Sequence, residues 1–206
     1  MVTTKPYSLS FTAASLRPEL ARVIAEHFLA ARDWGAARHQ ILDTNALQTR
    51  TPTSGIRLER ELRQRLMTLT LEQIQLVSAG SADERAALSW LAMLKYNAFI
   101  FEFAAETLRD KLAARDSTLR PSDYETFISV KTAAHSELHE LTETSKTKVR
   151  RVLLRMLTEA GILVAGDSLG TVQRSVPSPA VLRAIRNDDS SLLAGFLYPD
   201  AEILRL

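Results

Sequence analysis

Hydrophobic side chains recur at intervals of three or four residues through most of this chain, which is the spacing of amphipathic helices. The pattern predicts helices over residues 17–31, 54–69, 83–115 and 121–133, with shorter ones after Asp33 and after Thr70. Capping residues support two of these starts, because a Ser or Thr oxygen accepts a hydrogen bond from a free backbone N–H of the first turn. We expect Ser15 to cap the helix over residues 17–31, and Thr70 to cap the short helix that begins after Thr70.

The last third of the chain changes character. A helix over residues 145–160 is predicted by a full amphipathic stripe: Val149, Val152, Leu153, Met156, Leu157 and Ala160. Gly161 ends it, and two β-prone pieces follow at 162–165 and 171–174, separated by glycines and an aspartate that suit a hairpin. Helix, turn, helix and hairpin in this order are typical of a winged helix-turn-helix.

We therefore expect an all-α, multi-helix protein with a C-terminal winged helix-turn-helix that carries a small β-hairpin wing. Three consecutive segments are anticipated. Residues 1–80 would form an N-terminal helical domain with a basic, helix-turn-helix-like helix, residues 81–118 a central long buried helix, and residues 119–206 the winged-helix domain.

Composition agrees with a helical fold, since 7 Gly and 7 Pro in 206 residues are few for a sandwich or barrel. Zero Cys excludes a disulfide framework and a thiolate metal site. The most apolar stretch, residues 88–108, contains Lys95, Glu102 and Glu106, which with Arg109 form one narrow polar stripe. That stripe favours a helix buried among other helices over a membrane span. The N-terminus lacks a signal-peptide pattern, so we expect a cytoplasmic protein without membrane contact.

The net charge of +2 indicates nothing about partners by itself, but the charge is segregated locally. Five cations and no acid lie between residues 146 and 155, and a helical wheel places them opposite or beside the apolar stripe: Lys146, Lys148, Arg150, Arg151 and Arg155. Such a helix fits the major groove of DNA, where N-terminal residues meet base edges and cations meet phosphates. The residues that we expect to reach the base edges are Thr144, Ser145, Thr147 and Lys148. Arg174 is the cation of the expected wing.

A second basic helix follows a turn rich in Thr and Ser, which could donate to phosphates at a helix N-terminus. Its candidate DNA contacts are Arg50, Arg57, Arg60 and Arg63. We expect Leu58, Leu62, Leu66 and Leu69 to be buried, and Arg63 and Arg65 to flank that stripe. The alternative is a solvated, salt-bridged face, because Glu59 and Glu61 lie two to four residues from the arginines.

The sequence does not predict an enzyme, because it has no Gly-rich phosphate loop, no nucleophile elbow and no pair of acidic residues in a recognisable catalytic motif. No catalytic residue, cofactor, metal or small-molecule substrate is expected. His135 and His139 could offer two imidazoles one helical turn apart, but a third ligand is not apparent.

The alternatives to duplex DNA are an interaction scaffold whose basic faces dock an acidic protein of the same system, and RNA binding by a helical bundle. Oligomeric state, DNA sequence preference and whether the two basic helices share one face stay open.

Four blocks of the chain resemble the BrxA family of bacteriophage exclusion (BREX) defence systems, together with the Asp-Trp pair at residues 33–34. They are YSLSFTAASL (7–16), LQTRTPTSGIRLERELRQRLMTLT (47–70), LAMLKYNAFIFEFAAETLRDKL (91–112) and LTETSKTKVRRVLLRMLTEAGIL (141–163). The resemblance implies a cytoplasmic, mostly helical, non-enzymatic protein that binds double-stranded DNA beside the other proteins of its defence system. The resemblance assigns no catalytic residue to this chain. The segment after Leu169 resembles the family least.

Overall fold

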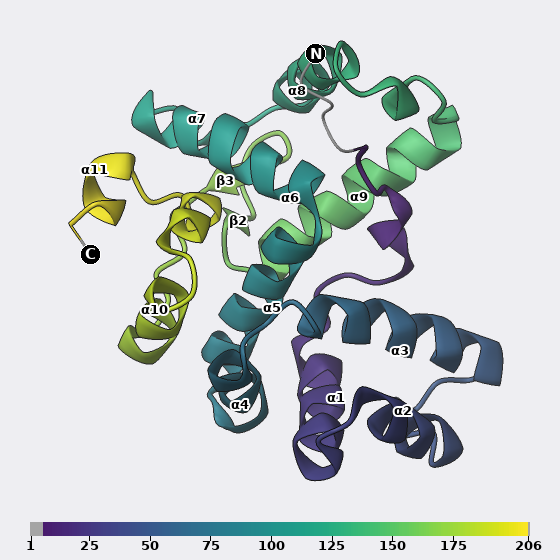
Figure 1. The fold of residues 1–206 in the computed structure, drawn as a ribbon. Helices are drawn as coiled ribbons and strands as arrows, with labels where there is room; N and C mark the ends of the chain where they lie inside the picture. Colours follow the sequence, from purple (N-terminus) through teal and green to yellow (C-terminus); the bar gives the residue numbers. More distant parts are fainter. Residues whose placement is uncertain (1–5, 206) are drawn as a thin grey trace. The chain divides into compact units, whose positions relative to one another are not determined.

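Helices account for most of the chain in the computed structural model, which describes residues 6–205 (Figure 1). The expected helical class is confirmed, beside one small antiparallel sheet. The described residues divide into two units. The helical unit comprises Ala13–Tyr96 and Val176–Ser190, and the sheet unit comprises residues 6–12, 97–175 and 191–205. Both combine segments that are distant in the sequence, whereas we expected three consecutive segments.

The helical unit contains six α-helices, several of which begin at a side-chain cap. They are α1 (Pro18–Ala31), α2 (Trp34–Asp43), α3 (Pro52–Leu66), α4 (Leu71–Ala79), α5 (Ala82–Tyr96) and α10 (Pro179–Arg186). The expected Thr70 cap is confirmed as a capping box, in which Thr70 and Gln73 bond each other's backbone N–H. The expected Ser15 cap is wrong: Arg17, in the left-handed region at φ 52°, precedes α1, and Ser15 is itself buried.

The core of the helical unit forms around α1, which contacts α2, α3, α4 and α5. Ile24 of α1, Leu62 and Leu66 of α3, and Trp90 and Leu91 of α5 are almost fully buried. Burying one such side chain contributes about 1.5–3 kcal/mol. These positions follow the helical spacing of the sequence, and the amphipathic pattern therefore explains which face of each helix packs inward.

Helix α3 departs from its expected pattern, because its inner face contains charges. Arg65 is 2% exposed, and Leu58, expected in the stripe, is only half-buried. The Arg65 guanidinium lies 2.9 Å from Glu61 Oε1 and donates to the carbonyls of Ala14 and Ser15 at 2.8 and 2.7 Å. Arg65 is therefore buried rather than flanking, because its N–H groups satisfy a carboxylate and two backbone carbonyls that are hidden from water.

The single long helix expected over residues 83–115 is wrong at Asn97. That residue is extended (φ −139°, ψ 105°), and its side chain accepts from the backbone N–H of Ile100 at 3.2 Å. It caps α6 (Ala98–Glu102), after which come a π-helical turn (Phe103–Leu108) and α7 (Arg109–Ala113). The Asn97 amide also donates to the carbonyl of Ser8 at 2.6 Å. An Asn side chain competes for backbone hydrogen bonds, which explains the break in an otherwise helical pattern.

The sheet unit continues with a second group of elements (Figure 1). These are β1 (Thr118–Leu119), α8 (Pro121–Thr132), a 3-10 turn (Ser136–Leu138), α9 (Glu143–Glu159), β2 (Leu163–Val164), β3 (Gly170–Val172) and α11 (Asp200–Ile203). A 3-10 stretch (Ser190–Phe196) precedes α11, and its first residue is the last one of the helical unit. Strand β3 lies between the others in the antiparallel order β1-β3-β2.

The register of the sheet places Leu119 opposite Gly170 and Leu163 opposite Val172. Gly170 has φ 133°, a conformation that residues with a Cβ rarely adopt, and a Cβ there would lie 2.6 Å from the carbonyl oxygen of Val164. A glycine is therefore required where the hairpin closes. The expected hairpin is confirmed, whereas β1 is an additional strand that the sequence pattern did not indicate.

A cluster of polar and aromatic side chains fixes the N-terminal segment onto the sheet unit. The Tyr7 ring stacks on His135 with centroids 3.6 Å apart, and its backbone N–H donates to Glu137 at 2.6 Å. The Tyr7 hydroxyl donates to Glu102 at 2.5 Å, and Lys131 bonds the same carboxylate. Tyr7 therefore connects α6 with the 3-10 turn that separates α8 from α9.

The stretch at residues 88–108, which looked most like a membrane span, is divided by Asn97 between α5 and α6. Within residues 6–205, none of the helices is both long enough and apolar enough to cross a bilayer.

Replacing Arg65 by methionine should strongly destabilise the helical unit. Arg65→Met leaves the Glu61 carboxylate buried without its partner, and breaking a buried pair in this way costs about 3–5 kcal/mol. Urea unfolding followed by circular dichroism measures the free energy of unfolding. Arg60→Met, an exposed change on the same helix, is the matched control and should shift it by less than about 0.5 kcal/mol. A loss below about 1 kcal/mol for Arg65→Met would contradict the role given to this pair.

The Tyr7 contacts predict a pH dependence of stability at alkaline pH. Burial, aided by the hydrogen bond to Glu102, raises the pKa of the Tyr7 phenol well above its ordinary value. Since the folded-state pKa exceeds the unfolded value of about 10, this contribution is present below pH 10 and is lost as the pH rises further.

Tyr7→Phe should reduce the free energy of unfolding at pH 7 by about 0.5–1.5 kcal/mol, because one hydrogen bond is lost. Urea titrations from pH 7 to pH 11 should show a shallower alkaline decline for Tyr7→Phe than for the wild type. Parallel declines would show that the Tyr7 hydroxyl is not the group responsible.

Candidate nucleic-acid interface

Helix α9 presents most of the residues that the sequence marks for DNA contact. It begins at Glu143, earlier than expected, because Thr142 caps it by accepting from the Ser145 N–H at 3.2 Å. Val149, Leu153, Met156 and Leu157 are buried on one face, as the stripe predicts. Burial of this face leaves the opposite one in solvent and thereby sets the direction in which the cations point.

The candidate residues of α9 differ in exposure. Lys148, Arg151 and Arg155 are exposed, as are Thr144 and Thr147, whereas Ser145, Lys146 and Arg150 are half-buried. The structure thus agrees with the helical wheel: the exposed cations lie opposite the buried stripe, and Lys146 and Arg150 lie beside it. The first turn of the helix presents small hydroxyl side chains rather than long apolar ones.

Only part of this charge is neutralised within the sheet unit. Lys146 lies 2.8 Å from Glu143, and Arg155 lies 3.1 Å from Glu159. Lys148, Arg150 and Arg151 make no ion pair with any residue between 6 and 205. Exposed pairs contribute only about 0–1 kcal/mol, so Lys146 and Arg155 can exchange their partners for another anion at little cost.

Arg174, the expected wing cation, is bound within the sheet unit. Its guanidinium donates to both carboxylate oxygens of Glu202 at 2.6 and 2.7 Å and lies 4.0 Å from the ring centroid of Tyr198. The hydrogen bonds to Glu202 raise the pKa of Arg174. Arg174, which follows β3, is therefore paired internally, and the charged residue of the loop between β2 and β3 is Asp167.

The second candidate set lies on α3 and on the turn before it, in the helical unit. Arg50, Arg57 and Arg60 are exposed and make no ion pair with a described residue. Arg63 differs, because its Nε donates at 2.6 Å to Glu59, a carboxylate that is fully buried. Three of the four candidates thus present an unpaired charge to solvent, and the fourth contributes to internal structure.

The turn before α3 is held by Asn45, which has a left-handed backbone (φ 48°). Its side-chain oxygen accepts from the Thr49 N–H at 3.0 Å, and its amide donates to the Thr49 carbonyl at 3.1 Å. Thr51 then caps the helix by accepting from the Ser54 N–H. These contacts fix the backbone on either side of Arg50.

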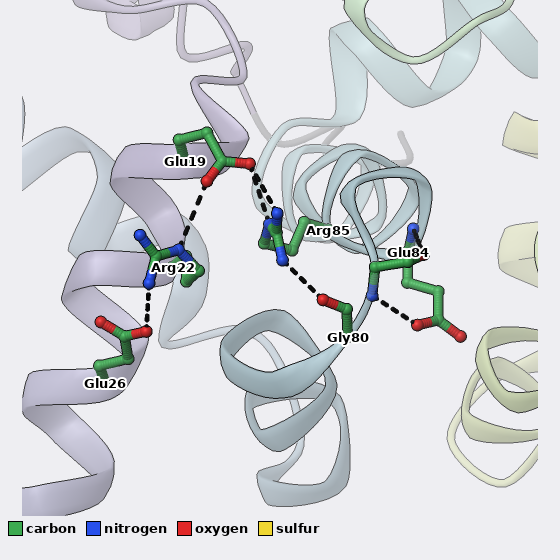
Figure 2. Close-up of polar contacts among 7 residues, drawn as sticks. Glu19, Arg22, Glu26, Gly80, Glu84 and Arg85 are labelled. Atoms are coloured by element: carbon green, nitrogen blue, oxygen red, sulfur yellow. Dashed lines mark hydrogen bonds and ion pairs between the residues drawn. The ribbon is translucent and has the colours of Figure 1, made fainter.

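Arg22 and Arg85 of the helical unit are neutralised by carboxylates, as Figure 2 shows. Arg22 bonds Glu26 at 2.5 Å, and Arg85 bonds Glu19 at 3.0 Å and the carbonyl of Gly80 at 2.6 Å. These residues form a charge-balanced surface, unlike the outer face of α3. The comparison separates structural arginines from those that remain open to an external anion.

A metal site is not found in the part of the chain that the structure describes, where no three His, Cys, Asp or Glu side chains converge. His135 stacks on Tyr7, and its Nδ1 lies 2.9 Å from Glu137. Its contacts are therefore those of a packed side chain.

Two features near α9 were not predicted from the sequence. One is the Thr142 cap, for which the T-x-x-S spacing with Ser145 was a usable signal. The other is a pocket between α8 and α9 around Tyr124 and Arg150, for which the linear sequence gives no signal, since its walls come from separate elements.

Residues 5–189 match the model of the BrxA family, which is most of the chain. The chain belongs to the BrxA family. Every candidate residue of the interface, from Arg50 to Arg174, lies inside that match, whereas Glu202, the partner of Arg174, lies outside it. The BrxA resemblance noted in the sequence is thereby confirmed.

A curated BrxA relative is the BREX protein BrxA of Escherichia coli O9:H4 (strain HS), which is 29% identical over 141 residues. The alignment covers 68% of this chain and 66% of the relative, just under two thirds of its length. A similar fold occurs in the crystal structure of an uncharacterized protein from Magnetospirillum magneticum, with a TM-score of 0.77 and 20% identity. That match covers 94% of this chain and 98% of the other, and at this identity it shows a shared fold alone.

Proposed function

We propose that this BrxA-family protein binds double-stranded DNA through α9 and has no enzymatic activity of its own. Membership of the family implies a component of a bacteriophage exclusion (BREX) defence system. The observation that carries the DNA-binding proposal is the outer face of α9, where Lys148 and Arg151 are exposed and have no acidic partner among residues 6–205.

The order of elements around α9 supports a winged helix-turn-helix. Strand β1, helix α8, a short turn, α9 and the β2-β3 hairpin follow one another, and β3 lies between the other two strands. In proteins of this kind the second helix enters the major groove with its N-terminal residues toward the base edges. We assign that role to α9 and the role of the wing to the loop between β2 and β3.

Within this arrangement the α9 residues divide into two roles. Thr144, Ser145, Thr147 and Lys148 belong to the first turns, and we assign them to the base edges and the phosphates beside them. Arg151 and Arg155 lie further along the exposed face and would contact phosphates. Lys146 and Arg150 lie at the border of the buried face, where they can reach only the near edge of the duplex.

The helical unit supplies a second set of phosphate contacts in this proposal. We assign it to Arg50, Arg57 and Arg60, whose charges have no internal partner in the described chain. Arg63 and Arg174 are bound to Glu59 and Glu202, so we expect them to contribute less than the sequence suggested. With few base-reaching side chains and many phosphate contacts, binding should show little sequence preference.

Reversing two charges on α9 should greatly weaken DNA binding. Lys148→Glu/Arg151→Glu replaces two exposed cations by anions and should lower the affinity for a 20-base-pair duplex by more than about tenfold at ~100 mM salt. The slope of log affinity against log salt should become shallower by about 2, since each phosphate contact contributes ~0.9. Fluorescence anisotropy across a salt series measures both quantities.

The matched control is Arg183→Glu/Arg186→Glu on α10, which makes the same change of charge at exposed residues outside the candidate set. It should retain most of the affinity. Equal losses in both variants would indicate that overall charge, and not the α9 face, governs binding. If the α9 variant binds DNA normally but loses a protein partner in co-purification, the scaffold alternative is favoured; preference for duplex RNA over duplex DNA in competition would favour the RNA alternative.

A further inference from the structure

A pocket of about 310 Å³ lies between α8 and the N-terminal half of α9. Tyr124 and Ile128 of α8, with Leu138 and Leu141 from the connection between the helices, provide its apolar surface. Ligand pockets in proteins start at roughly 300 Å³, so this one has room for a single ring system or a branched alkyl group. Nothing in the proposed DNA contacts requires a hollow at this position.

One charge on the pocket wall, that of Arg150, is not neutralised by any residue that the structure describes. Arg150 is half-buried and makes no ion pair with any described residue. The other charged residues of the lining are Lys146 and Glu143, which pair with each other at 2.8 Å, and Glu125, which is exposed to water. A partly desolvated guanidinium attracts an anion more strongly than a fully hydrated one, because screening is weaker there.

A neutral donor lies beside that charge. The Tyr124 side chain is 7% exposed, and its hydroxyl makes no hydrogen bond within residues 6–205. Burial raises the pKa of Tyr124 to about 12, while the nearby Arg150 lowers it. The phenol therefore keeps its proton at neutral pH and can donate it to an acceptor in the pocket.

We infer that this pocket binds a small organic anion with an apolar body, such as an aryl or branched-alkyl carboxylate. The carboxylate would pair with the Arg150 guanidinium and accept from the Tyr124 hydroxyl, and the apolar body would lie against Ile128, Leu138 and Leu141. The guanidinium presents a fork of N–H donors that matches the two oxygens of a carboxylate.

The position of the pocket gives such a ligand a consequence for the rest of α9. Lys146, Thr147 and Arg150 line the pocket and also belong to the candidate DNA interface. If the proposed DNA binding is correct, on which this consequence rests, a bound carboxylate removes the charge of Arg150 from the phosphates. Ligand and duplex should then weaken each other's binding by the same factor.

The test uses the full chain and three probes: 1-naphthaleneacetate, 3-phenylpropionate and 4-methylpentanoate. Isothermal titration, and amide chemical shifts in the absence of DNA, should show saturable binding of at least one probe at one site per chain. The shifts should centre on Tyr124, Ile128 and Leu138. The neutral amide of the same probe should bind at least about tenfold more weakly, because it lacks the charge-assisted hydrogen bonds.

Two variants locate the site. Arg150→Gln should weaken the carboxylate by about tenfold or more and leave the weak binding of the amide unchanged, a difference that a general loss of structure would not produce. Arg151→Gln, the same change one residue along on the exposed face, should leave probe binding intact. Failure of all three probes to bind the wild type, equal binding by Arg150→Gln, or shifts centred elsewhere would each overturn the proposal. Since these measurements contain no DNA, they stand or fall separately from the proposed function.

Discussion

The apolar stripe of α9 is the constraint on which the rest of this account depends. Val149, Leu153, Met156 and Leu157 are apolar, and α9 buries them by turning that face toward the rest of the sheet unit. Because a helix is rigid, this step also fixes the direction of Lys148, Arg151 and Arg155. The arrangement of positive charge is thus a consequence of packing, and no separate interaction is needed to hold it in place.

The second determinant is which cations find an acid inside the protein. Arg22, Arg65 and Arg85 each lie against a carboxylate. In α3 the buried Glu61–Arg65 pair occurs on the same helix as Arg57 and Arg60, which form no ion pair within the described part of the chain. A net charge of +2 therefore gives a poor description of this molecule. The candidate interface has a local excess of cations that no described residue compensates, and in the proposed function a polyanion such as duplex DNA would supply that compensation.

Much of the fold could be predicted from the sequence, because helical spacing, the Thr70 cap and the glycines of the hairpin are local signals. Three features could not be predicted from local signals. The break at Asn97 interrupts an apolar run that has helical spacing on both sides, and strand β1 has only two residues, whose partner lies about fifty residues away. The burial of Arg65 depends on carbonyls of Ala14 and Ser15 that come from another segment. The candidate site follows the same division: helical spacing predicted which cations of α9 are exposed, but it gave no sign that Glu202 pairs with Arg174.

The central claim is that the exposed N-terminal half of α9 touches duplex DNA. The chain has no cysteine, so a single one can be introduced without background and labelled with an azidophenacyl photocrosslinker. Thr147→Cys places the label on α9, and Asp110→Cys places it on the exposed surface of α7 in the same unit. We predict crosslinking of a 20-base-pair duplex from position 147 that declines as salt rises, and only background from position 110. Equal yields at the two positions, or none at 147 while the duplex is bound, would contradict the account.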